Sequence, residues 1–155
     1  MAIIENKYRI GVKYVNQNRL LTLRGIILLL EDLACRHSDM VGFGINDTFK
    51  TNISWVLLNW KIKILKEVNY GSTVTVKTWS RDTNKLYTYR DFEIYDENNN
   101  LICIASSKCV LLRTKTCHIT QITDEIRKAY IPENKTVFEE PEIAKLIEPA
   151  NANET

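Results

Sequence analysis

The stretch TLRGIILLLEDLACRH, residues 22–37, decides the fold. Its apolar residues recur at helical spacing, and Thr22 is suited to be the N-cap of the helix. Leu28 and Leu29 widen the apolar stripe almost to the whole circumference, which is typical of a helix enclosed by other elements. The glycines of DMVGFG, residues 39–44, end the helix and open a loop. We therefore expect one long central helix.

The sequence around this helix has the two-residue period of strands and is rich in β-branched and aromatic residues. The cluster DENNN, residues 96–100, predicts a hairpin turn between two of the strands. The predicted strands are residues 8–14, 53–65, 72–80, 86–96 and 101–113, with a short edge strand within 114–122. One strand, one helix and then four or five strands in an antiparallel meander predict an α+β hotdog fold, in which the sheet wraps around the central helix.

The chain of 155 residues has the length of a single domain. We assign residues 1–129 to one hotdog domain. Residues 130–155 contain all three prolines and several acidic residues, which predicts a C-terminal linker or tail.

Composition excludes several classes of function. The formal net charge is +2, and the sequence has no stripe of basic residues of the kind that would indicate nucleic-acid binding. The longest apolar run, Ile26 to Leu30, is too short to cross a membrane, and the start MAIIENKYR lacks the apolar region of a signal peptide. We expect a cytoplasmic protein. The four cysteines have no CxxC spacing, and with only two histidines the chain offers no familiar metal-ligand pattern, so we expect free thiols and no metal site. Phosphate-loop motifs are missing, so we expect no cofactor.

Four strings, in this order along the chain, resemble acyl-acyl-carrier-protein thioesterases. They are LLEDLACRHSDMVGFG (29–44), ISWVLLNWKIKI (53–64), NYGSTVTVKTWSRD (69–82) and YRDFEIYDENNNLICIASSKCVLL (89–112). Members of that family carry two hotdog halves in one chain, and the resemblance covers about residues 5–140 and the N-terminal half alone. It implies release of a fatty acid from acyl-acyl-carrier-protein in fatty acid biosynthesis, with an acyl carrier protein or coenzyme A thioester as partner.

The family's catalytic pattern, Asp-x-Asn-x-His at the start of the second hotdog helix, is absent from this sequence. In the corresponding place of this half, YVNQNRL puts Asn16 and Asn18 in the Asp and Asn positions and Leu20 in the His position. Only Asn18 matches in kind.

Three residues are candidates for catalysis. Glu31 lies on the margin of the apolar stripe, where a buried carboxylate could act as a general base; the alternative is an ion pair with Arg24 or Arg36. His37 lies on the stripe itself, which favours a buried, hydrogen-bonded core histidine over a catalytic one. Asn18 could orient a substrate, although capping the helix is the simpler role.

Other residues of the helix and the strands are weaker candidates for a role in catalysis or substrate binding. Asp32 lies opposite the stripe and is expected to be solvated, and Cys35 lacks a basic partner that would make it a nucleophile. Trp55 and Trp60 are candidates for lining an acyl pocket, or for the core. The free amides at the N-terminus of the helix, near residues 18–23, could polarise a thioester carbonyl.

The primary hypothesis is an acyl-thioester hydrolase that works as a homodimer, since a lone sheet of this kind leaves its edges unpaired. The alternative is a non-catalytic acyl-binding or dimerisation module, or the N-terminal fragment of a two-hotdog thioesterase. A hotdog dehydratase would need His37 or His118 in a substrate channel.

Overall fold

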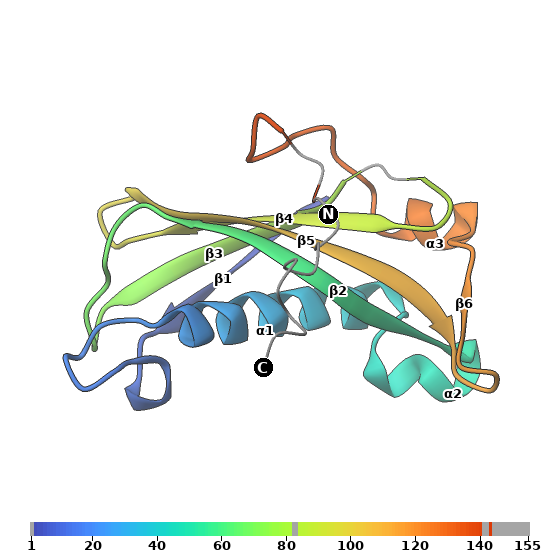
Figure 1. Ribbon diagram of the computed structural model, residues 1–155, viewed down its shortest axis with the longest axis horizontal. Coiled ribbons are helices and arrows are strands. Elements are labelled where there is room, and N and C mark those ends of the chain that lie inside the picture. The colour runs from blue at the N-terminus through green and yellow to red at the C-terminus, as the bar shows by residue number, and fades with distance from the viewer. Residues whose placement is uncertain (1, 82–83, 141–142, 144–155) are drawn as a thin grey trace, which may run out of the picture.

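The long helix α1 (Leu23–Val41) lies along the concave face of a curved antiparallel sheet, as Figure 1 shows for the computed structural model of the protein. The structure describes residues 2–81, 84–140 and 143. The strands are β1 (Ile3–Arg9), β2 (Ile53–Ile64), β3 (Thr73–Ser80), β4 (Thr88–Tyr95), β5 (Leu101–Arg113) and β6 (His118–Thr120). The short helices are η1 (Val12–Tyr14), η2 (Ile45–Asp47), α2 (Thr48–Thr51) and α3 (Asp124–Ala129). The predicted α+β arrangement is confirmed.

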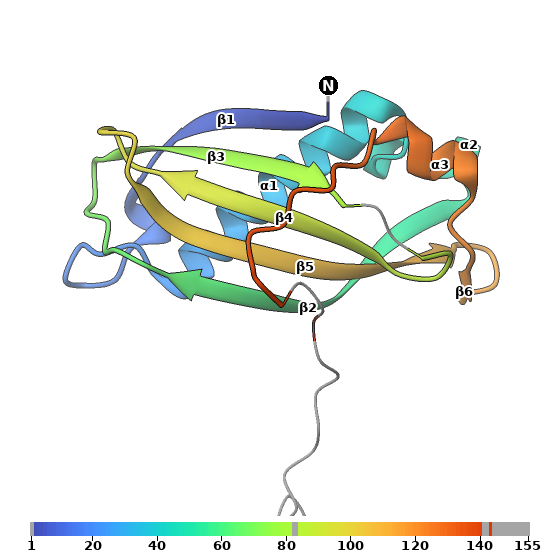
Figure 2. The ribbon, with the colours of Figure 1, turned by 90° about the horizontal axis from the view of Figure 1, so that it is seen from above.

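The strand order is β1-β3-β4-β5-β2, with β6 beside β5 (Figure 2). Strands β3, β4 and β5 form the predicted meander, but β2 pairs with β5 rather than with β3. The connection after β2 crosses the sheet at the start of α1, where the Leu21 amide donates to the Val68 carbonyl and the Gly71 amide to the Ile10 carbonyl. Because of this crossing, β3 pairs with β1, and β2 is an edge strand. The alternation of apolar and polar residues along a strand cannot predict which strands pair.

The first strand was predicted at residues 8–14 and lies instead at Ile3–Arg9. Its one buried residue is Ile4, and polar side chains occupy much of the rest of the strand, so the apolar alternation is weak. Ile10 is fully buried after the strand ends, and Gly11 then begins the 3₁₀ turn η1.

Both predicted ends of α1 are confirmed. The Thr22 side chain accepts a hydrogen bond from the Gly25 amide at 3.0 Å, and Gly42 closes the helix in the left-handed conformation, with φ of 86°. The buried residues of the helix are Gly25, Ile26, Leu29, Leu30, Leu33 and His37. Full enclosure was wrong, since Leu23 and Leu28 are 52% and 38% exposed. One flank of α1 is therefore left uncovered by the described chain.

Residues 131–140 cross the outer face of the sheet, opposite α1 (Figures 1 and 2). The Glu133 amide donates to the Ser80 carbonyl at 2.9 Å, and the Trp79 indole donates to the Lys135 carbonyl at 2.8 Å. The first part of the predicted linker or tail therefore packs on the sheet. The rest of the predicted tail, residues 141–142 and 144–155, lies outside the described residues.

Candidate functional site

A cavity of about 400 Å³ lies between α1 and the half of the sheet that ends in β2. One face of α1 contributes Glu31, Ala34, Cys35 and Ser38, which follow one another at helical spacing. The remaining wall comes from the loop after α1, from strands β2 to β5 and from the segment that contains α3. Apolar side chains predominate among the lining residues of these elements, which include Phe43, Ile45, Ile53, Trp55, Leu57, Trp60, Ile122 and Ile126.

A row of four residues crosses the sheet along the floor of the cavity. Ser80 of β3 is paired with Arg90 of β4, Arg90 with Ser107 of β5, and Ser107 with Trp60 of β2. Paired residues of neighbouring strands face the same side of a sheet. All four line the cavity, so the register of the strands places a guanidinium in the middle of this floor.

The Arg90 side chain is held from one end. Its Nη1 atom donates to His37 Nδ1 at 2.9 Å and to Thr78 Oγ1 at 3.2 Å, and its guanidinium carbon lies 5.6 Å from the centre of the Tyr130 ring. Burial lowers the pKa of Arg90. No carboxylate of the described chain forms an ion pair with it.

His37 is only 1% exposed and lies behind the cavity wall. Because arginine can only donate, Nδ1 of His37 accepts the bond from Arg90, and the imidazole proton lies on Nε2. Burial, together with the charge of Arg90, lowers the pKa of His37 to about 4. The predicted buried, hydrogen-bonded core histidine is confirmed.

Tyr130 connects three walls of the site. Its hydroxyl lies 2.8 Å from Ser38 Oγ and accepts a hydrogen bond from Trp55 Nε1 at 2.9 Å. The ring packs edge-on against His37, with centroids 5.2 Å apart. Burial raises the pKa of Tyr130, so its hydroxyl stays protonated.

Of the three predicted catalytic residues, Glu31 alone lines the cavity, but the residue is exposed and not buried as the general-base hypothesis supposed. The alternative prediction of an ion pair with Arg36 is wrong, because Arg36 pairs with Asp32 at 3.0 Å. Within the described chain no ion pair joins Glu31 to Arg24 either. Asp32 is exposed and also accepts a hydrogen bond from the Tyr8 hydroxyl, which confirms its solvated role.

Asn18 is exposed in a turn before α1, and its backbone N–H donates to Asn16 Oδ1 at 2.9 Å. The predicted capping role is wrong, because Thr22 caps the helix. The lining residues of α1 begin at Glu31, so the helix N-terminus presents no amide to this cavity.

Trp55 and Trp60 line the cavity, where the acyl-pocket prediction required them. Cys35 also reaches its wall, but burial and the nearby carboxylates of Asp39 and Glu31 raise the pKa of the thiol, which disfavours a thiolate nucleophile.

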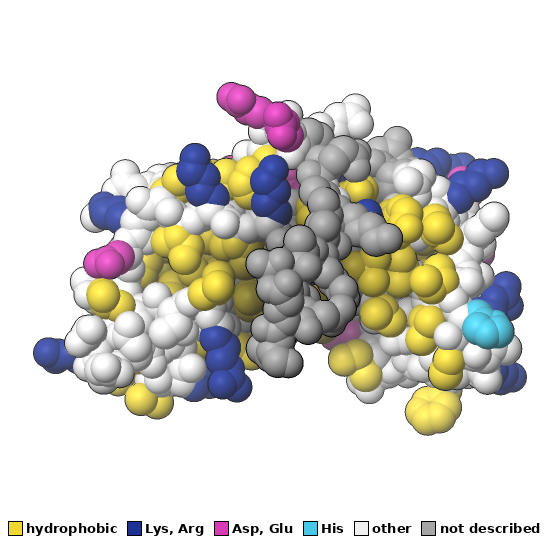
Figure 3. All heavy atoms as spheres, in the orientation of Figure 1, with side chains coloured by type: hydrophobic (Ala, Val, Ile, Leu, Met, Phe, Trp, Pro, Cys, Tyr) yellow, Lys and Arg dark blue, Asp and Glu magenta, His cyan; other side chains and the backbone are white. Residues whose placement is uncertain are grey.

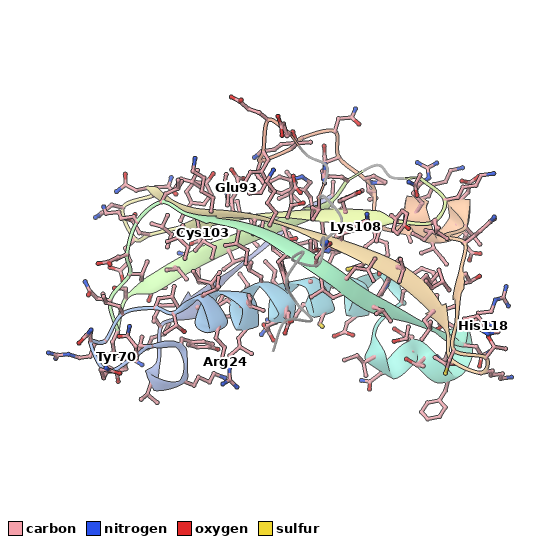
Figure 4. All side chains as sticks on the ribbon, in the orientation of Figure 1. Arg24, Tyr70, Glu93, Cys103, Lys108 and His118 are labelled. Atoms are coloured by element: carbon pink, nitrogen blue, oxygen red, sulfur yellow. The ribbon has the colours of Figure 1, made fainter. Side chains whose placement is uncertain are left out.

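His118 is exposed on β6, at the end of the molecule (Figure 4), so neither histidine lines the cavity as a dehydratase would need. All four cysteines are free, and no group of three or more metal-ligating side chains occurs among the described residues. Within the same residues, no helix has the length and apolar character to span a membrane.

The sequence reasoning missed Arg90 and Tyr130. Arg90 could have been found, because it alternates with Phe92 and Ile94, and strand periodicity places all three on the core face. Tyr130 carried no such signal, since it lay in the segment assigned to a tail.

Comparison with known proteins identifies the family. The model of the acyl-ACP thioesterase N-terminal domain matches residues 2–130. Oleoyl-acyl carrier protein thioesterase 2, chloroplastic, of Arabidopsis thaliana is 30% identical over 95% of this chain and 43% of its own length. This chain therefore spans less than half of that relative.

Solved structures share the architecture. The 12:0-ACP thioesterase from Umbellularia californica superposes with a TM-score of 0.82 and 20% identity, over 99% of this chain and 62% of that one. A Staphylococcus aureus protein in complex with CoA gives a TM-score of 0.79 at 12% identity, over 95% of this chain and 96% of that one. The α+β hotdog fold is thus confirmed. With its family match over residues 2–130, the chain belongs to the acyl-ACP thioesterase N-terminal domain family.

Proposed function

We propose that this protein is an acyl-thioester hydrolase that releases a fatty acid from acyl-acyl-carrier-protein. The observation that carries the proposal is the cavity of about 400 Å³, which has a mainly apolar wall and the Glu31 carboxylate on its lining. An apolar cavity of this size with a few polar groups is suited to a small acyl ligand. The acyl chain would lie against Trp55 and Trp60.

Glu31 is the proposed catalytic group. Thioester hydrolysis needs a base that activates water or a carboxylate that attacks the carbonyl carbon, and Glu31 can supply either. It has no ion-pair partner among the described residues that would hold it away from the cavity.

A second hotdog unit would complete the site, and we propose a homodimer. Strand β2 is an edge of the sheet, and Leu57 and Leu58 on it are 39% and 46% exposed. Figure 3 shows hydrophobic side chains gathered on the face that carries β2. Unpaired backbone groups beside apolar side chains favour association along this edge.

The thioester carrier in the proposal is an acyl carrier protein or coenzyme A. The names of the Arabidopsis and Umbellularia proteins support the former, and the CoA complex of the Staphylococcus protein supports the latter. Assays with both carriers at equal acyl chain length would rank them.

The experiment that tests the function measures the release of the free thiol from acyl-acyl-carrier-protein and from acyl-coenzyme A by the purified chain. We expect turnover in the wild type and at least tenfold slower turnover in Glu31→Gln. The Asp32→Asn variant is the matched control, because Asp32 is the adjacent carboxylate and does not line the cavity. Absence of turnover by folded wild-type protein would remove the enzyme proposal.

A non-catalytic acyl-binding module is the second candidate. It is favoured by the absence of the Asp-x-Asn-x-His pattern from this sequence and of histidine from the cavity wall. Binding of acyl ligands without thiol release, with full activity after addition of a second hotdog unit that carries the pattern, would establish this candidate.

We also propose that the protein works in the cytoplasm. The four free cysteines support a reducing compartment. The plant relatives differ in this respect, because their names place those proteins in the chloroplast. Cell fractionation with an antibody against the protein would test the location, and recovery outside the soluble cytoplasmic fraction would contradict it.

A further inference from the structure

The feature that the proposed function leaves unused is the positive charge on the cavity floor. Both hydrogen bonds of Arg90 to the protein use Nη1, which contacts His37 and Thr78. The Nε and Nη2 atoms have no hydrogen-bond partner among the described residues, and Arg90 lines the cavity. A guanidinium presents five donors in a planar fork, so part of this fork remains available to a ligand.

The surroundings of Arg90 do not neutralise its charge. His37 is neutral because it accepts the Arg90 bond, and Thr78 is an uncharged acceptor. Glu31 lines the same cavity but forms no ion pair with Arg90, while the other cation on the wall, Arg127, pairs with Asp124 at 3.7 Å. The cavity therefore has one cation that lacks an acidic partner within the described chain, and a monoanion would match it.

We propose that the cavity binds a free fatty acid as its anion, with the carboxylate on the Nε and Nη2 side of Arg90 and the alkyl chain along Trp55 and Trp60. A carboxylate has the two-oxygen geometry that accepts paired hydrogen bonds from a guanidinium. The predominantly apolar wall suits the alkyl chain.

His37 and Tyr130 give Arg90 a fixed position for this task. The 2.9 Å bond to His37 restrains one end of the guanidinium, and the Tyr130 ring lies beside it, with 5.6 Å between the guanidinium carbon and the ring centre. A donor that is already positioned loses less entropy when its ligand arrives. The released acid would consequently compete with the acyl thioester for the cavity.

This inference rests on the proposed function in one respect, namely that the cavity holds an alkyl chain. The experiment separates the two by comparing decanoic acid with methyl decanoate and decanol in calorimetric titrations of the wild-type protein near neutral pH. We expect the acid to bind about tenfold to a hundredfold more tightly than either neutral ligand, as for a charge-assisted pair. Equal affinity for all three would overturn the carboxylate site and leave the acyl cavity standing. Failure of all three to bind would overturn both.

Variants assign the preference to a side chain. Arg90→Gln should remove the preference for the acid while methyl decanoate still binds, and Arg90→Lys should retain part of it. Arg24→Gln is the matched control, because Arg24 is exposed on the side of α1 away from the sheet (Figure 4). An undiminished preference in folded Arg90→Gln would overturn the proposal.

A measurement on the wild type alone keeps the test valid if Arg90→Gln fails to fold. Decanoic acid labelled with 13C at its carboxyl carbon reports its own ionisation by NMR. Next to Arg90 the bound acid should have a lower pKa than the free acid, because an opposite charge favours the ionised form. A bound acid that titrates at or above the pKa of the free acid would refute the site.

Discussion

Lowering the pH from 7 to 4 should destabilise the fold through His37. The unfolded histidine has a pKa near 6.5, and burial with the neighbouring Arg90 charge lowers the folded value to about 4. Between these values the unfolded chain binds a proton that the folded chain excludes, so the free energy of unfolding falls as the pH falls. At about 1.4 kcal/mol per pKa unit the loss is about 3 kcal/mol, and it levels off below the folded pKa.

The assay is denaturant unfolding at a series of pH values, for the wild type and for His37→Asn. The asparagine oxygen can accept the Arg90 hydrogen bond in place of Nδ1 but does not titrate in this range. Acidic groups also titrate over part of this range in both proteins, so the difference between the two curves isolates His37. The wild type should lose about 3 kcal/mol more than the variant between pH 7 and 4. Parallel curves would refute the assignment of a buried neutral histidine.

Three further perturbations follow from the packing. Gly25→Ala should destabilise the fold by at least about 1 kcal/mol, although alanine usually stabilises a helix, because its Cβ would overlap the Tyr14 carbonyl oxygen; a raised thermal midpoint would contradict this close approach. Tyr130→Phe should cost about 1–3 kcal/mol in chemical unfolding, since Trp55 Nε1 and Ser38 lose their common partner; an unchanged midpoint would argue against that network. Leu58→Asp should shift sedimentation from dimer to monomer, and a wild type that is already monomeric at micromolar concentration would rule out the proposed homodimer.

The helix and most strands could be predicted because their signals are local. Thr22 and Gly42 mark the ends of α1, and residues 96–100 mark the turn between β4 and β5. The partner of β2 could not be predicted, because alternation tells which face a residue occupies and not which strand lies beside it. Leu28 was expected to be enclosed because it widens the apolar stripe of α1, but the stripe does not tell whether another element covers that flank of the helix.

The site was predicted in part. Trp55, Trp60 and Glu31 line the cavity as the patterns allowed, whereas Asn18 failed because Asn16 fixes a turn there instead. Tyr130 reaches the cavity because it is the C-cap residue of α3, whose segment forms part of the cavity wall, and no local pattern of residues encodes where that short helix packs.

The central claim is that the cavity between α1 and the sheet receives the acyl chain. Acyl-carrier-protein bearing a diazirine at the end of its acyl chain, photolysed on the wild-type protein, tests it most directly. We predict that mass spectrometry will find the label on residues that line the cavity, in the β2 peptide that contains Trp55 and Trp60. The same acyl-acyl-carrier-protein without the diazirine should suppress this labelling. Labelling confined to residues outside the cavity would contradict the claim.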